Sequence, residues 1–409
     1  MKFRLILLLI DLILIVNLNA QSKKEYIQYL KNNSIDIKNS GTNWDLVLDS
    51  SFYTNDFFWV GEEHAIKYSY DALWILFKQI HKKVGFKYYL LEASYIYEFY
   101  LNKYLETGDE KYLNMVFKAT KGTMGCNIDQ FEFYRKLYQY NQGLSKEKKI
   151  EFISIDIEHQ YNETDKYIRS LFHNLDLPKD TSDFVNIFLH TEGDYKNLYK
   201  KLSIDLSSDS IKYKMIFKSD YSTFWYLVRN INYTFQAYEV INSPKQWDQT
   251  RDSLMFENYK IRLLNHAFMK SKVFAYFGTN HCYLEKTKNI HWIASLIKNS
   301  NPALKSTSIV MLYSGCKAMR PIWLFPKNKR ISSKENKDYV NFSVDGDSKN
   351  IHRKSSRGNY ILFNIINTAT TFKTSKIFLN DTDNDKFMRD YFQYILLIKD
   401  SPASVPYGQ

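Results

Sequence analysis

The chain has 409 residues, of which 44% are hydrophobic, and a formal net charge of +12. This length is enough for one large domain with a substantial core. The lysines are dispersed, and no recognisable module combines a basic stripe with aromatic residues, so the composition does not predict nucleic-acid binding. Cys126, Cys282 and Cys316 lack metal-ligand spacing. At most one disulfide can form among them, which leaves one thiol.

Residues 1–20 have the pattern of a secretory signal peptide. Lys2 and Arg4 precede an apolar centre, and the small residue Ala20 stands before Gln21. An uncleaved membrane anchor is the alternative, although the apolar run is short for a spanning helix. We therefore expect residues 21–409 to form one exported domain, periplasmic or secreted, with no membrane span after cleavage.

Residues 57–92 predict a strand–helix–strand unit with parallel strands. An apolar run covers residues 57–60, and the apolar positions from Ile66 onward then recur on one face of a helix. Gly85 suits the end of that helix because glycine tolerates positive φ. A second apolar run covers residues 88–91, and two parallel strands joined by a helix are the usual result of this pattern.

The rest of the chain predicts more strands and helices of the same kind. Further strands are expected over 150–155, 273–277, 307–313, 359–366 and 375–379. Helices are expected over 24–32, 95–105, 110–118, 128–141, 290–298 and 385–398, the last of which closes the chain. We predict an α/β fold in which helices flank a central, largely parallel sheet.

Two long segments interrupt this alternation. Residues 160–270 lack strand signals and predict a helical insertion or subdomain, with helices over 162–175, 182–202, 211–241 and 246–270. Residues 328–357 are charged and polar, which predicts a surface loop.

Ionisable residues follow four of the predicted strands, namely Glu62, Glu63 and His64, then Glu92, then Asp156, and finally His281. Ligands of open parallel sheets bind outside the carboxyl ends of the strands, so we expect these residues to share one site. Two histidines and several carboxylates can hold a general base that activates water, or a metal ion. Taken singly, Glu92 or Asp156 could instead cap a helix.

Other candidate residues have structural interpretations. His81, His159, His190 and His266 are expected to be surface or satisfied core residues. A nucleophilic Cys282 beside His281 is conceivable, but adjacent residues on a strand point to opposite sides.

Several motifs resemble the erythromycin esterase family, in that family's order, from about residue 57 to 285. They are Gly61-Glu62-Glu63-His64, Gly85-Phe86 with Leu91-Glu92-Ala93, Arg251-Asp252-x-x-Met255-x-x-Asn258, and Gly278 with Asn280-His281. The wider superfamily includes ChaN-type haem-binding lipoproteins and TraB-type metalloproteases. The family usually has two residues between the acid and the histidine and then a glycine, whereas this chain has one residue and then Ala65.

The resemblance implies a cleft at the strand ends and hydrolysis of an ester or macrolactone without a metal or other cofactor. Carried over, His64 deprotonates water, Glu62 and Glu92 orient His64 and the water, and His281 completes the pocket. The residues implied to bind substrate or brace the cleft are Glu63, Asp156, Arg251 and Asp252. Arg251 could instead form an ion pair on the surface of its helix.

The sequence thus predicts an exported hydrolase that acts on a small-molecule ester or lactone. Three alternatives stay open: a metal-dependent hydrolase or peptidase with His64, His281 and nearby carboxylates as ligands, a binding protein for haem or another ligand, and a family member whose site no longer works. Nothing in the sequence names the substrate, because a fold does not determine its ligand.

Overall fold

The computed structural model describes residues 28–173, 183–191, 193–264, 271–287, 290–323, 331–336, 358–366, 386 and 388–408. The predicted signal peptide and the predicted strand over 375–379 lie outside these residues. So does most of the predicted loop over 328–357.

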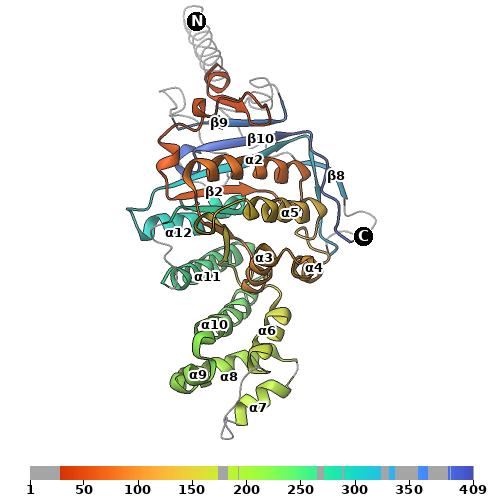
Figure 1. The fold of residues 1–409 in the computed structure, drawn as a ribbon, viewed down its shortest axis with the longest axis vertical. Coiled ribbons are helices and arrows are strands. Elements are labelled where there is room, and N and C mark those ends of the chain that lie inside the picture. The colour runs from red at the N-terminus through yellow and green to blue at the C-terminus, as the bar shows by residue number, and fades with distance from the viewer. Residues whose placement is uncertain are drawn as a thin grey trace, which may run out of the picture.

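An eight-stranded sheet lies at the centre of the molecule (Figure 1), in the order β1-β9-β10-β6-β2-β5-β3-β4. The strands are β1 (Ser34–Asp36), β2 (Phe57–Glu62), β3 (Tyr88–Leu91), β4 (Glu151–Ser154), β5 (Val273–Gly278), β6 (Ser306–Ser314), β9 (Tyr360–Asn364) and β10 (Tyr394–Lys399). The six strands from β10 to β4 pair in parallel, while β9 is antiparallel to both β10 and β1. The predicted α/β class with a largely parallel sheet is confirmed.

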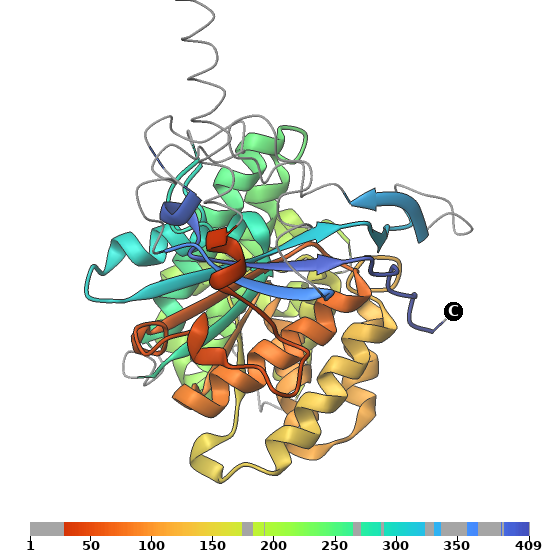
Figure 2. The same ribbon diagram turned by 90° about the horizontal axis from the view of Figure 1, so that it is seen from above.

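Helices cover both faces of this sheet, which explains why its strands are continuous apolar runs. One face packs against α2 (Lys67–Val84) and α5 (Ile128–Gln142), and the other against α11 (Pro244–Leu264) and α12 (Ile293–Ser300). Figure 2 shows α2 and α5, in orange and yellow, on one side of the strands and α12, in cyan, on the other. Successive β2 residues alternate between these layers: Phe58 faces α2, and Trp59 faces α11 and α12.

A group of helices extends from one end of the molecule, on the side opposite β9 and β10 (Figure 1). Its members are α6 (Tyr161–His173), α7 (Asp183–His190), α8 (Tyr195–Ser208), α9 (Ser210–Phe217) and α10 (Tyr221–Tyr238). They share an apolar core that includes Phe172, Tyr199 and Phe224. Between this group and the sheet lie α3 (Tyr95–Thr107) and α4 (Glu110–Ala119). We call α6–α10 the helical arm.

Two long helices predicted for the arm are each divided in two. The helix predicted over 182–202 is interrupted near Gly193, whose φ is +82°, and the one over 211–241 is interrupted at Lys218, whose φ is +48°. A left-handed residue cannot continue a right-handed helix, so the chain turns at each position.

The closing helix predicted over 385–398 is wrong. Only Met388–Tyr391 is helical (α14), and Tyr394–Lys399 forms strand β10 between β6 and β9. A strand buried on both faces is a continuous apolar run, and periodicity alone does not distinguish such a run from a buried helix. The predicted strand–helix–strand unit is confirmed, since β2 and β3 are parallel and lie on either side of β5.

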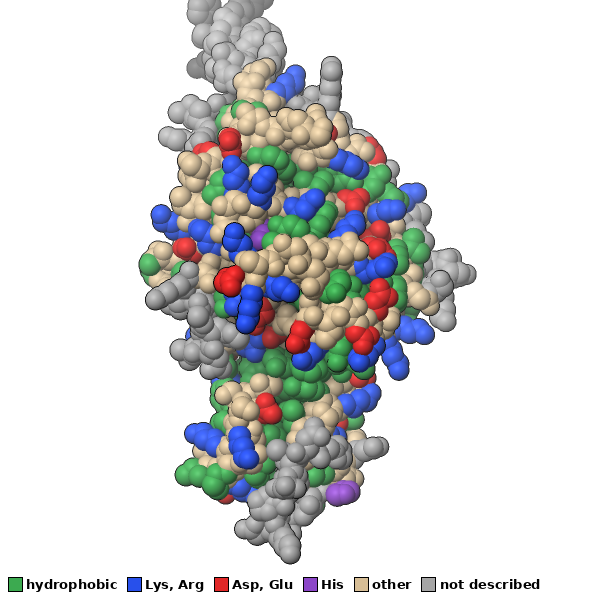
Figure 3. All heavy atoms as spheres, viewed as in Figure 1, with side chains coloured by type: hydrophobic (Ala, Val, Ile, Leu, Met, Phe, Trp, Pro, Cys, Tyr) green, Lys and Arg blue, Asp and Glu red, His purple; other side chains and the backbone are tan. Residues whose placement is uncertain are grey.

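Outside the main sheet, β7 (Cys316–Met319) pairs with β8 (Ile331–Asn336). All three cysteines are buried, and the one possible disulfide is not formed. Within the described residues, no helix combines the length and the apolar character needed to cross a bilayer. On the face shown in Figure 3, basic and acidic side chains are interspersed, in keeping with the dispersed lysines of the sequence.

Candidate active site

The carboxyl ends of four neighbouring strands deliver the predicted site residues to one place. Glu62 is the last residue of β2, Glu92 directly follows β3, Asp156 follows β4, and His281 lies in the short 3-10 turn Thr279–Cys282 after β5. Because these strands are adjacent and parallel, their ends meet at one edge of the sheet. A cavity of about 710 Å³ opens there, and Glu62, Glu92 and Asp156 line it.

His64 is bonded to a buried carboxylate. Its Nδ1 lies in hydrogen-bond contact with Oε1 of Glu62, whose side chain is 3% exposed, whereas the His64 side chain is 44% exposed. The negative charge of Glu62 raises the pKa of His64 to about 9, which outweighs the opposing effect of burial. His64 also lines the main cavity. Glu62 therefore fixes the ring orientation and makes the imidazole more basic.

Two residues much later in the chain, Met319 and Ser404, hold the turn that carries His64. Ala65 has a φ of +62°, which non-glycine residues seldom adopt. Its carbonyl oxygen accepts hydrogen bonds from the N–H of Met319 at 3.1 Å and of Ser404 at 3.0 Å. The one-residue spacing between Glu62 and His64 thus still places His64 at the cavity, with Ala65 where the family has glycine.

Arg251 connects three of the strand ends. From α11 it donates through Nε to Oδ1 of Asp156 at 3.0 Å and through Nη2 to Oε1 of Glu92 at 2.7 Å, and its Nη1 lies 3.1 Å from Nε2 of His281. Its side chain is only 12% exposed, so the alternative of a surface ion pair is wrong.

The charges around Arg251 hold its partners ionised. Burial alone would raise the pKa of Glu92, but the positive charges of His281, Arg251 and His64 lower it to about 2. The pKa of Asp156 is also lowered, because Arg251 and His159 outweigh the effect of burial. Buried carboxylates stay charged only with such partners.

A second carboxylate orients His281. Its Nδ1 lies 2.8 Å from Oδ2 of Asp252, and Oδ1 of Asp252 accepts from the N–H of Ile293, at the start of α12, at 2.6 Å. Burial lowers the pKa of His281, but Asp252 and Glu92 raise it by more. His281 is thus fixed between Asp252 and the Arg251–Glu92 pair.

Glu63 lies apart from these residues. Its N–H donates to the hydroxyl of Tyr313 at 3.0 Å, and its carboxylate lies 3.4 Å from Nη1 of Arg320. It lines an adjoining cavity of about 430 Å³, which shares Glu62, His64, Glu92, Met124 and Arg251 with the main one. A role of Glu63 in substrate binding stays a prediction. By contrast, Asp156 is already bound to Arg251, and Asp252 is already bound to His281.

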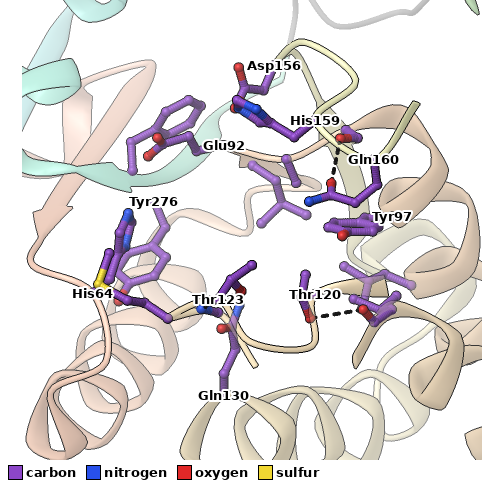
Figure 4. A pocket seen from close by; sticks show the side chains of 18 of the residues that line it. His64, Glu92, Tyr97, Thr120, Thr123, Gln130, Asp156, His159, Gln160 and Tyr276 are labelled. Atoms are coloured by element: carbon purple, nitrogen blue, oxygen red, sulfur yellow. Dashed lines mark hydrogen bonds and ion pairs between the residues drawn. The ribbon is translucent and has the colours of Figure 1, made fainter. Parts of the chain in front are cut away.

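His159, interpreted from the sequence as a surface or satisfied core residue, also lines the main cavity (Figure 4). Its Nε2 lies 3.4 Å from Oδ2 of Asp156, and its Nδ1 lies 3.1 Å from the Tyr238 hydroxyl. The sequence feature that could have pointed to His159 is its position three residues after Asp156.

Aromatic residues that the sequence did not single out also line the cavity. Figure 4 shows Tyr276 beside His64 and Tyr97 across the cavity from them, and Tyr238 and Trp247 line it as well. The chain has 33 tyrosines, so residue type alone could not identify them.

Cys282 is not placed to act as a nucleophile. It is fully buried, and burial raises the pKa of its thiol well above the usual range. A buried cysteine in such surroundings is unreactive.

Comparisons with known proteins show the fold. A Bacillus cereus protein aligns with a TM-score of 0.63 and 15% identity, over 94% of this chain and 99% of that one. A succinoglycan biosynthesis protein aligns with a TM-score of 0.61 and 12% identity, over 93% and 98%. A variant of the erythromycin esterase EreC in its open conformation aligns with a TM-score of 0.64 and 12% identity, over 91% and 97%.

No family model matches the sequence, and no curated protein matches it. At these identities the likeness shows a shared α/β fold over nearly the whole chain, and a fold does not fix a reaction. The comparisons therefore support the predicted fold and do not identify a reaction.

Proposed function

We propose that this chain is a hydrolase of small-molecule esters or lactones, in which His64 is the general base. The observation that carries this proposal is the bond between His64 Nδ1 and Glu62 at the edge of the main cavity. With Nδ1 bonded to the carboxylate, Nε2 is the nitrogen that can take a proton from water. The likeness to an erythromycin esterase supports the same class.

The proposed reaction adds water across the acyl–oxygen bond. Neutral His64 accepts a proton at Nε2 as the water oxygen attacks the carbonyl carbon, and the imidazolium then returns that proton to the leaving alkoxide. The products are a carboxylic acid and an alcohol. Arg251 faces the same cavity, where its guanidinium stabilises the negative charge that develops on the carbonyl oxygen.

A metal-dependent reaction fits these residues less well. The ligands considered for a metal ion are His64, His281 and one or more of Glu62, Glu92 and Asp156. Arg251 already donates to Glu92 and Asp156, and its Nη1 lies 3.1 Å from Nε2 of His281. Among the described residues, no three His, Cys, Asp or Glu side chains are grouped so that they could hold a metal ion. The guanidinium takes the place that a cation would occupy.

The test is hydrolysis by the purified mature chain, residues 21–409, of a panel of aliphatic esters and of lactones of several ring sizes. Acid release is followed at constant pH, with and without chelator, and metal content is measured on the same sample. We expect turnover that chelator does not change. Turnover that rises and falls with bound metal would refute His64 as a base, and an inactive enzyme on the whole panel would refute the proposal.

Export is part of the proposal and rests on residues 1–20 alone. Fractionation of cells that produce the full chain should place the protein outside the cytoplasm, shortened by about 20 residues. A full-length cytoplasmic protein would contradict it.

A further inference from the structure

Two polar atoms at the His64 end of the main cavity lack a hydrogen-bond partner among the described residues. They are Oε2 of Glu62 and the hydroxyl of Tyr276, and both atoms are buried. The Glu62 residue is 4% exposed, and both residues line the cavity. Buried polar groups are nearly always paired in folded proteins, so two unpaired ones at a cavity wall need an explanation.

The strand register makes these two residues neighbours. In the pairing of β2 with β5, Val60 lies opposite Tyr276 and Glu62 lies opposite Gly278. Side chains two residues apart on a strand point to the same face, so Glu62 and Tyr276 share the face that meets α2 and α5. Figure 4 shows the Tyr276 side chain beside His64 at one end of the cavity.

The two atoms have complementary hydrogen-bonding chemistry. A carboxylate oxygen only accepts, and a tyrosine hydroxyl can donate. We propose that Glu62 and Tyr276 form a subsite for a hydroxyl group of the substrate, which donates to Glu62 and accepts from Tyr276. An ether oxygen or a methylene would leave Glu62 unpaired, and a second carboxylate would be repelled by it.

This subsite rests on the proposed function, and it narrows the substrate class to hydroxylated acyl compounds. The wall beyond the subsite is largely apolar, with Leu91, Leu101 and Phe133, and the buried hydroxyl of Tyr97 is also unpaired among the described residues. A substrate of this cavity is therefore an acyl compound that carries its hydroxyl close to the scissile carbonyl.

The experiment compares 4-nitrophenyl butyrate with its 2-hydroxy and 3-hydroxy derivatives. A site built to bond a hydroxyl strongly rejects an analogue that lacks it. We expect the wild type to favour one hydroxylated ester by about 100-fold in kcat/KM, and Tyr276→Phe to reduce that ratio about tenfold or more. Thermal unfolding of each variant establishes that it is folded.

Tyr394→Phe is the matched control. Tyr394 is also a fully buried tyrosine of the sheet whose hydroxyl is unpaired among the described residues, but it lies at the opposite end, where β10 begins. This variant should keep the wild-type ratio. A wild type that cleaves all three esters equally, or a Tyr276→Phe variant that keeps the preference, would overturn the subsite alone. A wild type that cleaves none of the esters or lactones would overturn the proposed function.

Discussion

His64 and Arg251 have different environments, and this difference supports the different roles proposed for them. His64 has one close carboxylate partner and a side chain that is 44% exposed, so it can exchange protons with water and substrate. Arg251 is 12% exposed, donates to Glu92 and Asp156 and contacts His281, so it is fixed. A base must gain and lose a proton, whereas a stabilising charge must stay in place.

The role of His64 predicts the effect of removing its imidazole. His64→Ala should lower kcat/KM by about 10²–10⁴-fold, the usual contribution of a positioned general base. The variant should fold normally, because the side chain is partly exposed. Steady-state kinetics on any ester that the wild type cleaves provide the measurement. As a control, His291→Ala, at an exposed histidine, should be fully active. Full activity of His64→Ala would contradict the role of His64 as the general base.

The environment of Arg251 predicts an effect on stability. Arg251→Met leaves Glu92 and Asp156 buried without their main partner, which should lower the free energy of unfolding by about 3–5 kcal/mol. Urea denaturation measures this change. Arg135→Met, which removes exposed ion pairs with Glu110 and Glu132, should cost less than about 1 kcal/mol. Equal costs for the two variants would show that the Arg251 pairs are not effectively buried.

At the scale of elements, strand β2, which leads into the turn of His64, packs closely against the turn that carries His281. A Cβ added to Gly61 would lie 3.0 Å from Cα of Thr279 and 3.2 Å from Cβ of Cys282. Only glycine allows β2 to approach the turn of His281 so closely. The next turn, at Ala65, is held by Met319 and Ser404, so residues after position 315 help to position His64.

The left-handed backbone at Ala65 predicts that glycine stabilises the protein. Ala65→Gly removes a conformational cost of about 1–2 kcal/mol but adds chain entropy to the unfolded state, for a net gain of about 0.5–1 kcal/mol. Ala65→Val should destabilise, since a β-branched residue is still less tolerant of positive φ. Urea midpoints of both variants test this pair. If Ala65→Gly lowers the urea midpoint, the left-handed backbone at Ala65 does not contribute significantly to the free energy of unfolding.

At the scale of the whole molecule, the strand ends of the sheet supply the ionisable groups, and the helical arm and α11 supply part of the cavity wall. Tyr238, the last residue of α10, and Trp247, in α11, line the cavity beside His159. The sheet therefore carries both the proposed base and the proposed hydroxyl subsite, and these two helices add further cavity surface that a substrate is expected to contact.

This arrangement predicts that Trp247→Ala weakens substrate binding and spares the chemical step. KM should rise about tenfold, with kcat within about twofold, because the lost contact serves ground state and transition state alike. Trp225 packs in the arm and does not line the cavity, so Trp225→Ala should leave KM unchanged. A fall in kcat with unchanged KM for Trp247→Ala would place this residue in the chemical step instead.

Much of this organisation follows from local sequence patterns, and the rest depends on tertiary contacts. Apolar runs that end in acids or histidine predict the strand ends, since both strand and polar terminus are local features. The pairing of Arg251 with Glu92 and Asp156 joins residues 159 and 95 positions apart, which no local pattern specifies. Likewise, Tyr394–Lys399 becomes a strand only because β6 and β9 flank it.

The central claim, that Glu62 makes His64 the base, is tested most directly by the pH dependence of kcat/KM. The active form is neutral imidazole, and the pKa of His64 is raised to about 9, so activity should rise with pH to a midpoint near 9. Glu62→Gln removes the charge that raises this pKa, so the midpoint should move down toward the usual value of 6.5. A flat profile, or the same midpoint in both proteins, would contradict the account.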